Sequence, residues 1–232
     1  MSGGDEVVRS WSALRARADA AARRAGREPA SVRIVGAAKR QPPARVAAAV
    51  RAGLRDLGEN YVQEAVAMRA ALAESLDPPL AAALTWHGIG HLQRNKARDA
   101  LACFTWFHGV DSVALAAELS KRAEHDVTVL LQVNLSREAT KSGVAESDLP
   151  ALLDAARALP HLRVAGLMTM PAPAEDPEAS RPMFAQLRAL AERHGLAELS
   201  MGMSDDFEVA IEEGATLVRI GTALFGARGD AQ

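Results

Sequence analysis

Short apolar runs alternate with longer amphipathic stretches along the whole chain. The longest runs are continuously apolar and rich in Val, Leu and Ile, which is typical of parallel strands covered on both faces. We expect eight strands, over residues 32–38, 54–58, 85–90, 106–110, 127–134, 164–170, 199–203 and 217–221.

The stretches between the strands have the period of amphipathic helices, and some of them carry start and stop signals. The segment 43–51 begins with Pro43, which suits the first turn of a helix, and ends before Gly53, which suits a C-cap. Asp111 is the expected N-cap of a later helix. A further helix over 6–25 precedes the first strand.

Eight strands, each followed by a helical stretch, predict an α/β protein built as a single (β/α)8 barrel of the TIM type, with an extra N-terminal helix. A doubly wound sheet is the alternative, but it usually needs fewer strands and a glycine-rich first turn. The proline-rich segment 171–177 is interpreted as a loop of the barrel, because the same pattern resumes after it. We therefore expect one domain over residues 1–232.

Composition narrows the class of protein further. The chain has 232 residues, 49% of them apolar, and a formal net charge of −2, so nothing in it favours a nucleic-acid or membrane partner. The single cysteine, Cys103, excludes an internal disulfide and fits a reducing compartment. The pattern of a secretory signal, an apolar run long enough for a membrane span and a sustained heptad seam are all missing. We expect a cytoplasmic monomer.

Lys39 is the most informative candidate, because functional residues of such barrels gather at the C-terminal ends of the strands. Only four of the 27 basic residues are lysines, and Lys39 alone directly follows an expected strand. A lysine that loses hydration there has a lowered pKa, and its free amine can form a Schiff base. The alternative is a surface lysine whose stem packs on the barrel.

The turns after the last two strands suit a phosphate. Ser200 and Ser204 supply hydroxyl groups ahead of an expected helix over 204–213, and Gly221 and Thr222 open the final helix. Helix N-termini present free N–H groups to an anion, and barrels often bind phosphate after strands seven and eight. The alternative is a pair of ordinary helix caps.

Arg219 is a charged residue within an apolar strand, so it must pair with a group inside the barrel. That group is either a structural carboxylate or a ring nitrogen of a ligand. Glu59 and Asn60 end the second strand, and each of them is either a helix cap or a ligand contact.

Two further motifs are incomplete. His87 and His91 have the spacing of metal ligands, but Gly88 and Gly90 argue against the helix that would align them, and no HExxH motif is present. The two glycines also lack the third glycine of a dinucleotide-binding turn. We expect no metal site.

Six stretches that span residues from about 35 to 228 match a known family. They are VGAAKRQPP, RDLGENYVQEA, WHGIGHLQRNK, LLQVNLSREATKSGV, VAGLMTMPAP and LSMGMSDDFEVAIEEGATLVRIGTALFGAR. In these stretches the sequence resembles the pyridoxal-phosphate-binding homeostasis proteins, the YggS/PROSC family. The last stretch is the most specific of the six.

The resemblance implies a barrel of the alanine-racemase type (fold type III of the pyridoxal-phosphate proteins) without the second, β-rich domain of the racemases. It implies that pyridoxal 5'-phosphate (PLP) is held covalently on Lys39 as an internal aldimine. Arg219 would face the pyridine nitrogen, and Asn60 and His87 would lie near the ring. The phosphate would be bound by Ser200, Ser204, Gly221 and Thr222.

The resemblance also implies a carrier or buffer in vitamin B6 homeostasis, whose partners are PLP and the apo-enzymes that need it. PLP is a weak electron sink when its ring nitrogen is unprotonated, as it would be opposite Arg219. Racemases compensate with a base on each face of the cofactor, whereas this chain has a single tyrosine, Tyr61, and no second domain. We therefore expect a carrier with no catalytic residues. The alternatives are a racemase- or decarboxylase-like enzyme and a barrel for another phosphorylated metabolite.

Two positions depart from the family pattern. Ala38 stands where a serine commonly precedes the lysine, and Gln41 stands where a second lysine commonly follows it. Lys39 itself is kept, but Gln41 cannot serve as a second Schiff-base site.

Overall fold

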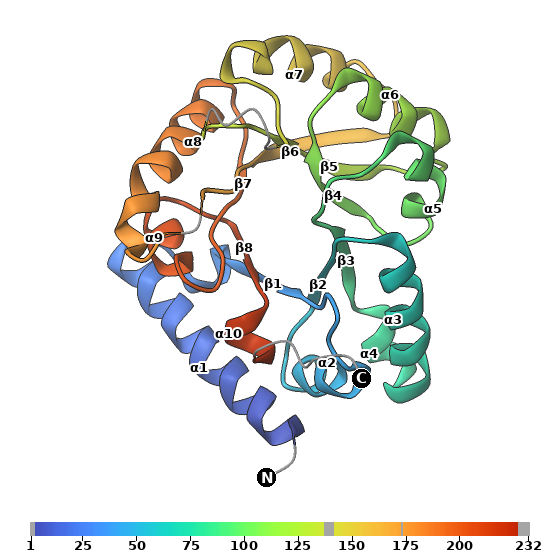
Figure 1. Cartoon of the computed structure of the whole chain (residues 1–232), viewed down its shortest axis with the longest axis vertical. Helices are drawn as coiled ribbons and strands as arrows, with labels where there is room; N and C mark the ends of the chain where they lie inside the picture. Colours follow the sequence, from blue (N-terminus) through green and yellow to red (C-terminus); the bar gives the residue numbers. More distant parts are fainter. Residues whose placement is uncertain (1–2, 137–141, 173, 227–232) are drawn as a thin grey trace.

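The computed structural model describes residues 3–136, 142–172 and 174–226. Its parallel strands pair in chain order, and the last pairs with the first, which closes the barrel (Figure 1). The predicted (β/α)8 barrel is confirmed, and every expected strand overlaps an observed one. The strands are β1 (Arg33–Ala37), β2 (Asp56–Glu59), β3 (Thr85–Gly88), β4 (Trp106–Val110), β5 (Val127–Gln132), β6 (Leu162–Met168), β7 (Glu198–Ser200) and β8 (Leu217–Ile220).

Helices surround the barrel and connect successive strands (Figure 1). The helix predicted over 43–51 has those bounds, and the helix predicted over 6–25 begins earlier, at Gly3. The α-helices are α1 (Gly3–Arg24), α2 (Pro43–Arg51), α3 (Val62–Ser75), α4 (Pro78–Ala82), α5 (Ala97–Leu101), α6 (Val113–Arg122), α7 (Leu149–Arg157), α8 (Arg181–Arg193), α9 (Phe207–Glu212) and α10 (Thr222–Phe225). Short 3-10 helices lie at η1 (Pro29–Ser31), η2 (Arg94–Lys96), η3 (Glu146–Asp148) and η4 (Pro177–Ser180).

The N-cap of α6 differs from the prediction. Ser112 caps the helix, because its hydroxyl accepts a hydrogen bond from the N–H of Leu115 at 3.3 Å. Asp111 lies outside the helix, with a carboxylate oxygen 3.5 Å from Nδ1 of His91. A serine directly before the first turn competes successfully with an aspartate one residue further away.

Apolar side chains form two layers. The outer layer fills the space between the strands and the helices, and the inner one lies within the barrel. Alternate residues of a strand face opposite sides, so a strand can contribute to both layers, and β1, β4, β5, β6 and β8 do. The buried members of the inner layer are Val35, Trp106, Leu130, Met168 and Leu217.

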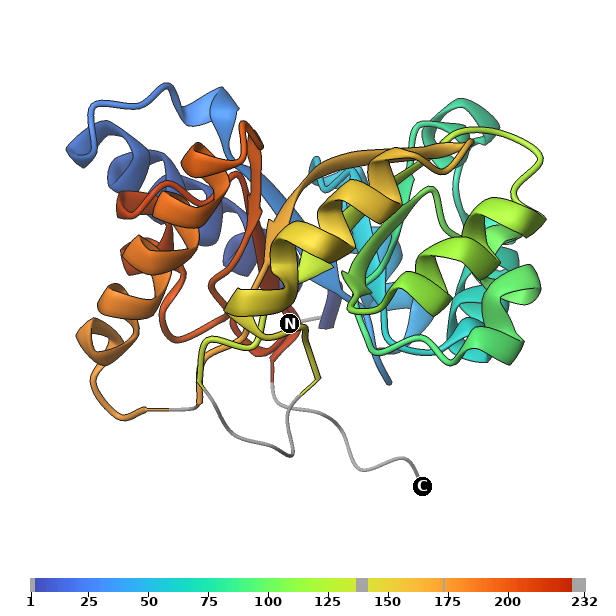
Figure 2. The same ribbon diagram turned by 90° about the horizontal axis from the view of Figure 1, so that it is seen from above.

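Helix α1 lies beside α9, α10 and α2, next to the place where β1 and β8 close the barrel (Figures 1 and 2). Arg17 and Arg24 of α1 pair with Glu208 of α9 at 2.7 and 3.0 Å. The extra helix thus covers the seam between the first and last strands. None of the helices in the described ranges combines the length and the hydrophobicity of a membrane span.

Candidate ligand-binding site

Lys39 lies at the C-terminal end of the barrel, directly beyond β1. A tight turn holds it, because the N–H of Gln41 donates to the carbonyl of Ala38 at 2.9 Å and Arg40 adopts a left-handed conformation with φ 55°. That conformation costs a non-glycine residue roughly 1–2 kcal/mol, so the surrounding structure must fix the turn. The half-buried side chain places Nζ 5.0 Å from the ring centre of Tyr61.

The other lysines lie elsewhere. Lys96 belongs to η2 and Lys121 to the last turn of α6, while Lys141 lies outside the described residues. Within the described ranges Lys39 is therefore the lysine that follows a barrel strand at its C-terminal end, as predicted.

Glu59 and Asn60 face different sides of the barrel wall. Gly58 faces the interior, where a Cβ would touch Val35 and Ile89, so the next residue, Glu59, faces the helices. Burial raises the pKa of Glu59 to about 8, and the nearby Glu64 adds to the shift. The N–H of Asn60 and the ammonium group of Lys39 oppose this rise, but neither carboxylate oxygen has a hydrogen bond of good geometry.

The two turns predicted to bind phosphate lie together. The hydroxyl of Ser204 accepts a hydrogen bond from the N–H of Ala223 at 3.2 Å, which joins the turn after β7 to the first turn of α10. Gly221 precedes that helix and Thr222 begins it. Three of the four predicted phosphate contacts therefore lie at one point on the rim of the barrel.

Helix α9 begins later than the predicted helix over 204–213. The carboxylate of Asp206 accepts a hydrogen bond from the N–H of Met203 at 2.7 Å and holds these residues in a turn, so the helix starts at Phe207. Gly202 enters the turn with φ 89°, in the left-handed region that favours glycine. The turn leaves Ser204 beside α10 rather than inside α9.

Arg219 is buried in the barrel interior, where Nη1 donates to Oγ of Ser200 at 2.5 Å and Nη2 donates to the carbonyl of Thr169 at 3.0 Å. Burial lowers its pKa to about 10, and the negative charge of Asp206 opposes the shift. The side chain therefore stays cationic at neutral pH. Because a guanidinium only donates, a ligand atom that faces it must accept a hydrogen bond.

His87 lies deeper than the rim. It is fully buried within β3, with Nε2 2.9 Å from Oδ1 of Asp56 and Nδ1 2.9 Å from Nε2 of His108. Nδ1 of His108 lies 2.8 Å from Oγ of Ser200. His87 is therefore connected to the predicted site only indirectly, through His108 and Ser200.

His87 and His91 do not form one site. His87 is inside the barrel, whereas the side chain of His91 is 54% exposed beside Asp111. Among the described residues, no group of three or more His, Cys, Asp or Glu side chains is placed to hold a metal ion.

A cavity of about 350 Å³ opens at the C-terminal ends of β2, β3, β5 and β6. Asn60 lies on its wall, and Thr169 connects it to Arg219 through the 3.0 Å hydrogen bond. Its lining residues are Asn60, Ile89, Gly90, His91, Gln132, Val133, Asn134, Leu135, Ser142, Met168, Thr169 and Met170.

The chemistry of these donors fits a phosphorylated aldehyde with a ring nitrogen. Lys39 supplies the amine that such an aldehyde needs, and the buried cation of Arg219 supplies a donor for a nitrogen lone pair. Ser204 and Thr222 supply hydroxyl groups beside the glycine that opens α10. The structure thus defines a (β/α)8 barrel whose C-terminal end combines a lysine, a buried arginine and the turns predicted to bind phosphate.

Comparison with known proteins makes the assignment more specific. The family model for the N-terminal domain of alanine racemase matches residues 10–229, and the chain belongs to this family. A pyridoxal phosphate homeostasis protein of Pseudomonas aeruginosa is 48% identical over 227 residues, 96% of each chain. PipY of Synechococcus elongatus, in a structure with PLP bound, is 36% identical with a TM-score of 0.80, and the match covers 95% of this chain and 100% of that one.

An alanine racemase shares the barrel but is longer. The enzyme of Corynebacterium glutamicum gives a TM-score of 0.68 at 19% identity, over 95% of this chain and 62% of the racemase chain. At that identity the likeness shows the fold alone.

Sequence reasoning missed Asp56 and His108, which connect His87 to the rest of the interior. The signal was available, because His108 follows Trp106 by two residues in an apolar strand and so faces the same side. Asp56 stands two residues before Gly58 and shares its inward direction. Both side chains contact His87, and these contacts depend on the register of the barrel strands.

Proposed function

We propose that the chain binds PLP at the C-terminal end of its barrel, through a Schiff base on Lys39. The observation that carries the proposal is the arrangement of Lys39, the buried Arg219 and the Ser204–Ala223 contact around the same rim. The names of the full-length relatives and the PLP-bound PipY structure support it.

Each predicted residue has a task in this proposal. Lys39 holds the aldehyde carbon, Arg219 donates toward the ring nitrogen, and Asn60 borders the ring from the cavity wall. Ser204, Gly221 and Thr222 bind the phosphate, and Ser200 completes the set by holding Arg219. His87 acts through His108 and Ser200 rather than by touching the ring.

We further propose a homeostatic role, in which one unit over residues 1–232 stores PLP and supplies it to apo-enzymes in the cytoplasm as a monomer. PLP supplies an electron sink when its ring nitrogen is protonated, and an arginine at that nitrogen weakens the sink. This chemistry favours a carrier over a racemase- or decarboxylase-like enzyme. The buried Cys103, a free thiol, fits a reducing compartment.

Reduction with borohydride tests the covalent site. PLP-loaded protein is reduced, digested and mapped by mass spectrometry, and we expect the pyridoxyl group on the peptide that contains Lys39. Lys39→Ala should lose the adduct and keep its circular dichroism, while the exposed Lys121→Ala should keep both. An unlabelled Lys39 in PLP-loaded wild type would disprove the proposal.

Proton exchange tests the absence of catalysis. The PLP-loaded protein is incubated with a panel of amino acids in deuterated solvent, and the α-proton signals are followed by NMR. We expect less than one exchange per protein molecule. Sustained exchange over many turnovers would favour the enzyme instead.

A further inference from the structure

Five polar side chains form a continuous hydrogen-bonded chain through the barrel interior, which we call the interior chain. It runs from Asp56 through His87, His108 and Ser200 to Arg219, with contacts of 2.9, 2.9, 2.8 and 2.5 Å. His87, His108 and Ser200 are completely inaccessible to solvent. A polar group buried in this way needs each of its hydrogen bonds, so the interior chain must be satisfied as a whole.

The two ends of the interior chain fix which group donates and which accepts at each of its hydrogen bonds. Arg219 can only donate and the carboxylate of Asp56 can only accept. Since Ser200 accepts from Arg219, its own proton is available for Nδ1 of His108. His108 then carries its proton on Nε2 and donates it to Nδ1 of His87, and His87 donates from Nε2 to Asp56.

The opposite arrangement fails at Asp56. If both histidines carried their protons on Nδ1, a bare Nε2 of His87 would face a carboxylate oxygen at 2.9 Å, with two acceptors and no proton between them. Burial lowers the pKa of both histidines, that of His108 well below its usual value, so an extra proton on either ring is disfavoured. One arrangement therefore satisfies all five groups.

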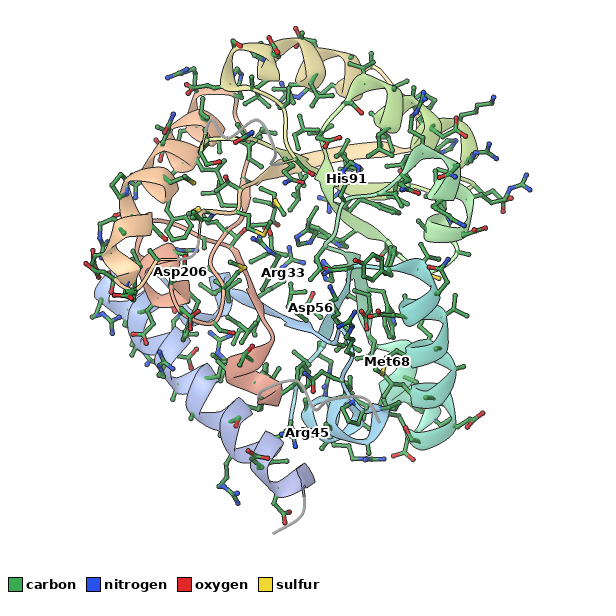
Figure 3. The ribbon with its side chains drawn as sticks, in the orientation of Figure 1. Arg33, Arg45, Asp56, Met68, His91 and Asp206 are labelled. Carbon is green, nitrogen blue, oxygen red and sulfur yellow. The ribbon has the colours of Figure 1, made fainter. Side chains whose placement is uncertain are left out.

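Asp56 lies at the opposite end of the barrel from the ligand site. It begins β2, and its neighbour Arg33 begins β1, with an N–O distance of 3.9 Å between them. Both labelled side chains lie within the ring of strands in Figure 3. The same Arg33 lies 3.2 Å from Glu198, the first residue of β7. Glu198 thus shares the charged surroundings of Asp56 without belonging to the interior chain.

We propose that Asp56 is a positioning residue for the ligand site, which sets the proton positions of both histidines and thereby directs the hydroxyl proton of Ser200 toward Nδ1 of His108 and away from Arg219. Its effect reaches the rim through three intermediate side chains and needs no movement of the backbone. The consequence for PLP rests on the proposed function, whereas the proton positions do not.

Nitrogen NMR of the cofactor-free protein tests the proton positions directly. In protein labelled with ¹⁵N at histidine, we expect two buried, neutral rings at pH 8, both with the proton on Nε2. A proton on Nδ1 of either ring in the wild type would overturn the proposal.

Asp56→Leu tests whether the aspartate sets this direction. Without the acceptor, the Nε2 proton of His87 would be buried and unpaired, and a shift of both ring protons to Nδ1 removes that unpaired donor. The hydroxyl of Ser200 then accepts from His108 as well as from Arg219, and its own proton rotates away from His108. Both histidines should therefore move their protons to Nδ1, including His108, which does not touch residue 56. The matched control, Glu198→Gln, removes a charge from the same barrel end and should leave both rings unchanged.

A folded Asp56→Leu protein whose His108 keeps its Nε2 proton would contradict the proposal. If circular dichroism shows that this variant does not fold, Asp56→Asn replaces it, because an amide can donate as well as accept. A mixture of both proton positions is then expected, and an unchanged wild-type spectrum would count against the proposal.

PLP titration measures the effect at the rim. We expect Asp56→Leu to bind PLP about tenfold more weakly, roughly the effect of one misdirected hydrogen bond, and Glu198→Gln to bind it within about twofold of the wild type. Equal affinity in a variant with switched histidines would refute the positioning role. Failure of the wild type to bind PLP would instead refute the proposed function, and the NMR result would still stand.

Discussion

Glu59 is a carboxyl group in a place where its charged form is costly. It is buried behind the barrel wall next to Glu64, and the two oxygens of its carboxyl group lack good hydrogen bonds. Its pKa rises from 4.5 in the unfolded chain to about 8 in the folded one. The folded state therefore binds a proton that the unfolded state releases between these pH values, and folding becomes less favourable as the pH rises through this window.

Glu59→Gln should remove this dependence on pH. The wild type loses stability between about pH 4.5 and pH 8, by about 4 kcal/mol in total, since each pKa unit corresponds to about 1.4 kcal/mol. The variant should be more stable than the wild type at pH 9, and the advantage should shrink toward pH 5. Urea unfolding at a series of pH values measures it.

Glu74→Gln serves as the control on α3, because Glu74 is exposed. It should follow the wild-type profile. A difference between Glu59→Gln and the wild type that does not change with pH would show that the carboxyl of Glu59 is charged in the folded protein.

At the scale of elements, the turn from β7 to α9 depends on Gly202. Its φ of 89° is strained for any other residue, and a Cβ there would lie 2.5 Å from Cβ of Ala210 and 3.1 Å from Cα of Phe207. Its carbonyl also accepts a hydrogen bond from the N–H of Arg219 at 3.0 Å. The glycine thus couples the turn between β7 and α9 to the strand that carries the buried arginine.

Gly202→Ala should cost about 3 kcal/mol or more, because backbone strain of about 1–2 kcal/mol adds to an overpacking cost of about 1–3 kcal/mol. PLP binding should weaken as well, since Ser204 moves with the turn. Thermal unfolding and PLP titration measure the two effects.

Gly195→Ala is the matched control, with φ 63° and open space around the added Cβ. This variant should lose only the stability that corresponds to the backbone strain, about 1–2 kcal/mol, and PLP binding should not change. Equal losses in both variants would mean that the contact with Ala210 relaxes at no cost.

The elements themselves were predictable from the sequence, because an apolar run and its flanking Pro or Gly are local signals. The bounds of β4 and α2 agree with the prediction residue for residue. The start of α9 was not predictable in this way, since it depends on how the carboxylate of Asp206 folds back onto Met203. Acidic residues that are typical of the first turn of a helix can equally form a turn outside it, when one of their side chains accepts a hydrogen bond from the nearby backbone.

Site residues were predictable as far as strand ends define them. Lys39, Ser204, Gly221 and Thr222 lie on the predicted rim because every barrel strand ends on the same face. The neighbours of His87 were not predictable, because its contacts with Asp56 and His108 join three strands through the stagger of the closed barrel.

At the scale of the whole molecule, the interior chain makes folding sensitive to acid. His87 and His108 are neutral and buried in the folded protein, and burial lowers the pKa of each. In the unfolded chain both regain an ordinary pKa near 6.5 and bind protons below it. The stability that depends on their neutral forms is therefore complete above about pH 6.5 and is lost as the pH falls.

His108→Gln should weaken the acid sensitivity while lowering stability at pH 8, where the interior chain loses one of its members. Each histidine that stays neutral in the folded state contributes about 1.4 kcal/mol per pH unit below pH 6.5. The difference in the free energy of unfolding between wild type and variant should therefore shrink by about 1.4 kcal/mol when the pH falls from 6 to 5. Urea unfolding over this range measures it, and comparing two proteins cancels the opposite effect of Glu59.

His125→Gln is the control for the last prediction, because His125 is exposed at the surface and has no place in the interior chain. It should run parallel to the wild type at every pH. If His108→Gln also ran parallel, the ring of His108 would already be protonated in the folded protein. That result would also count against the single direction of the interior chain, since a charged His108 would donate from both nitrogens and Ser200 would no longer give it a proton.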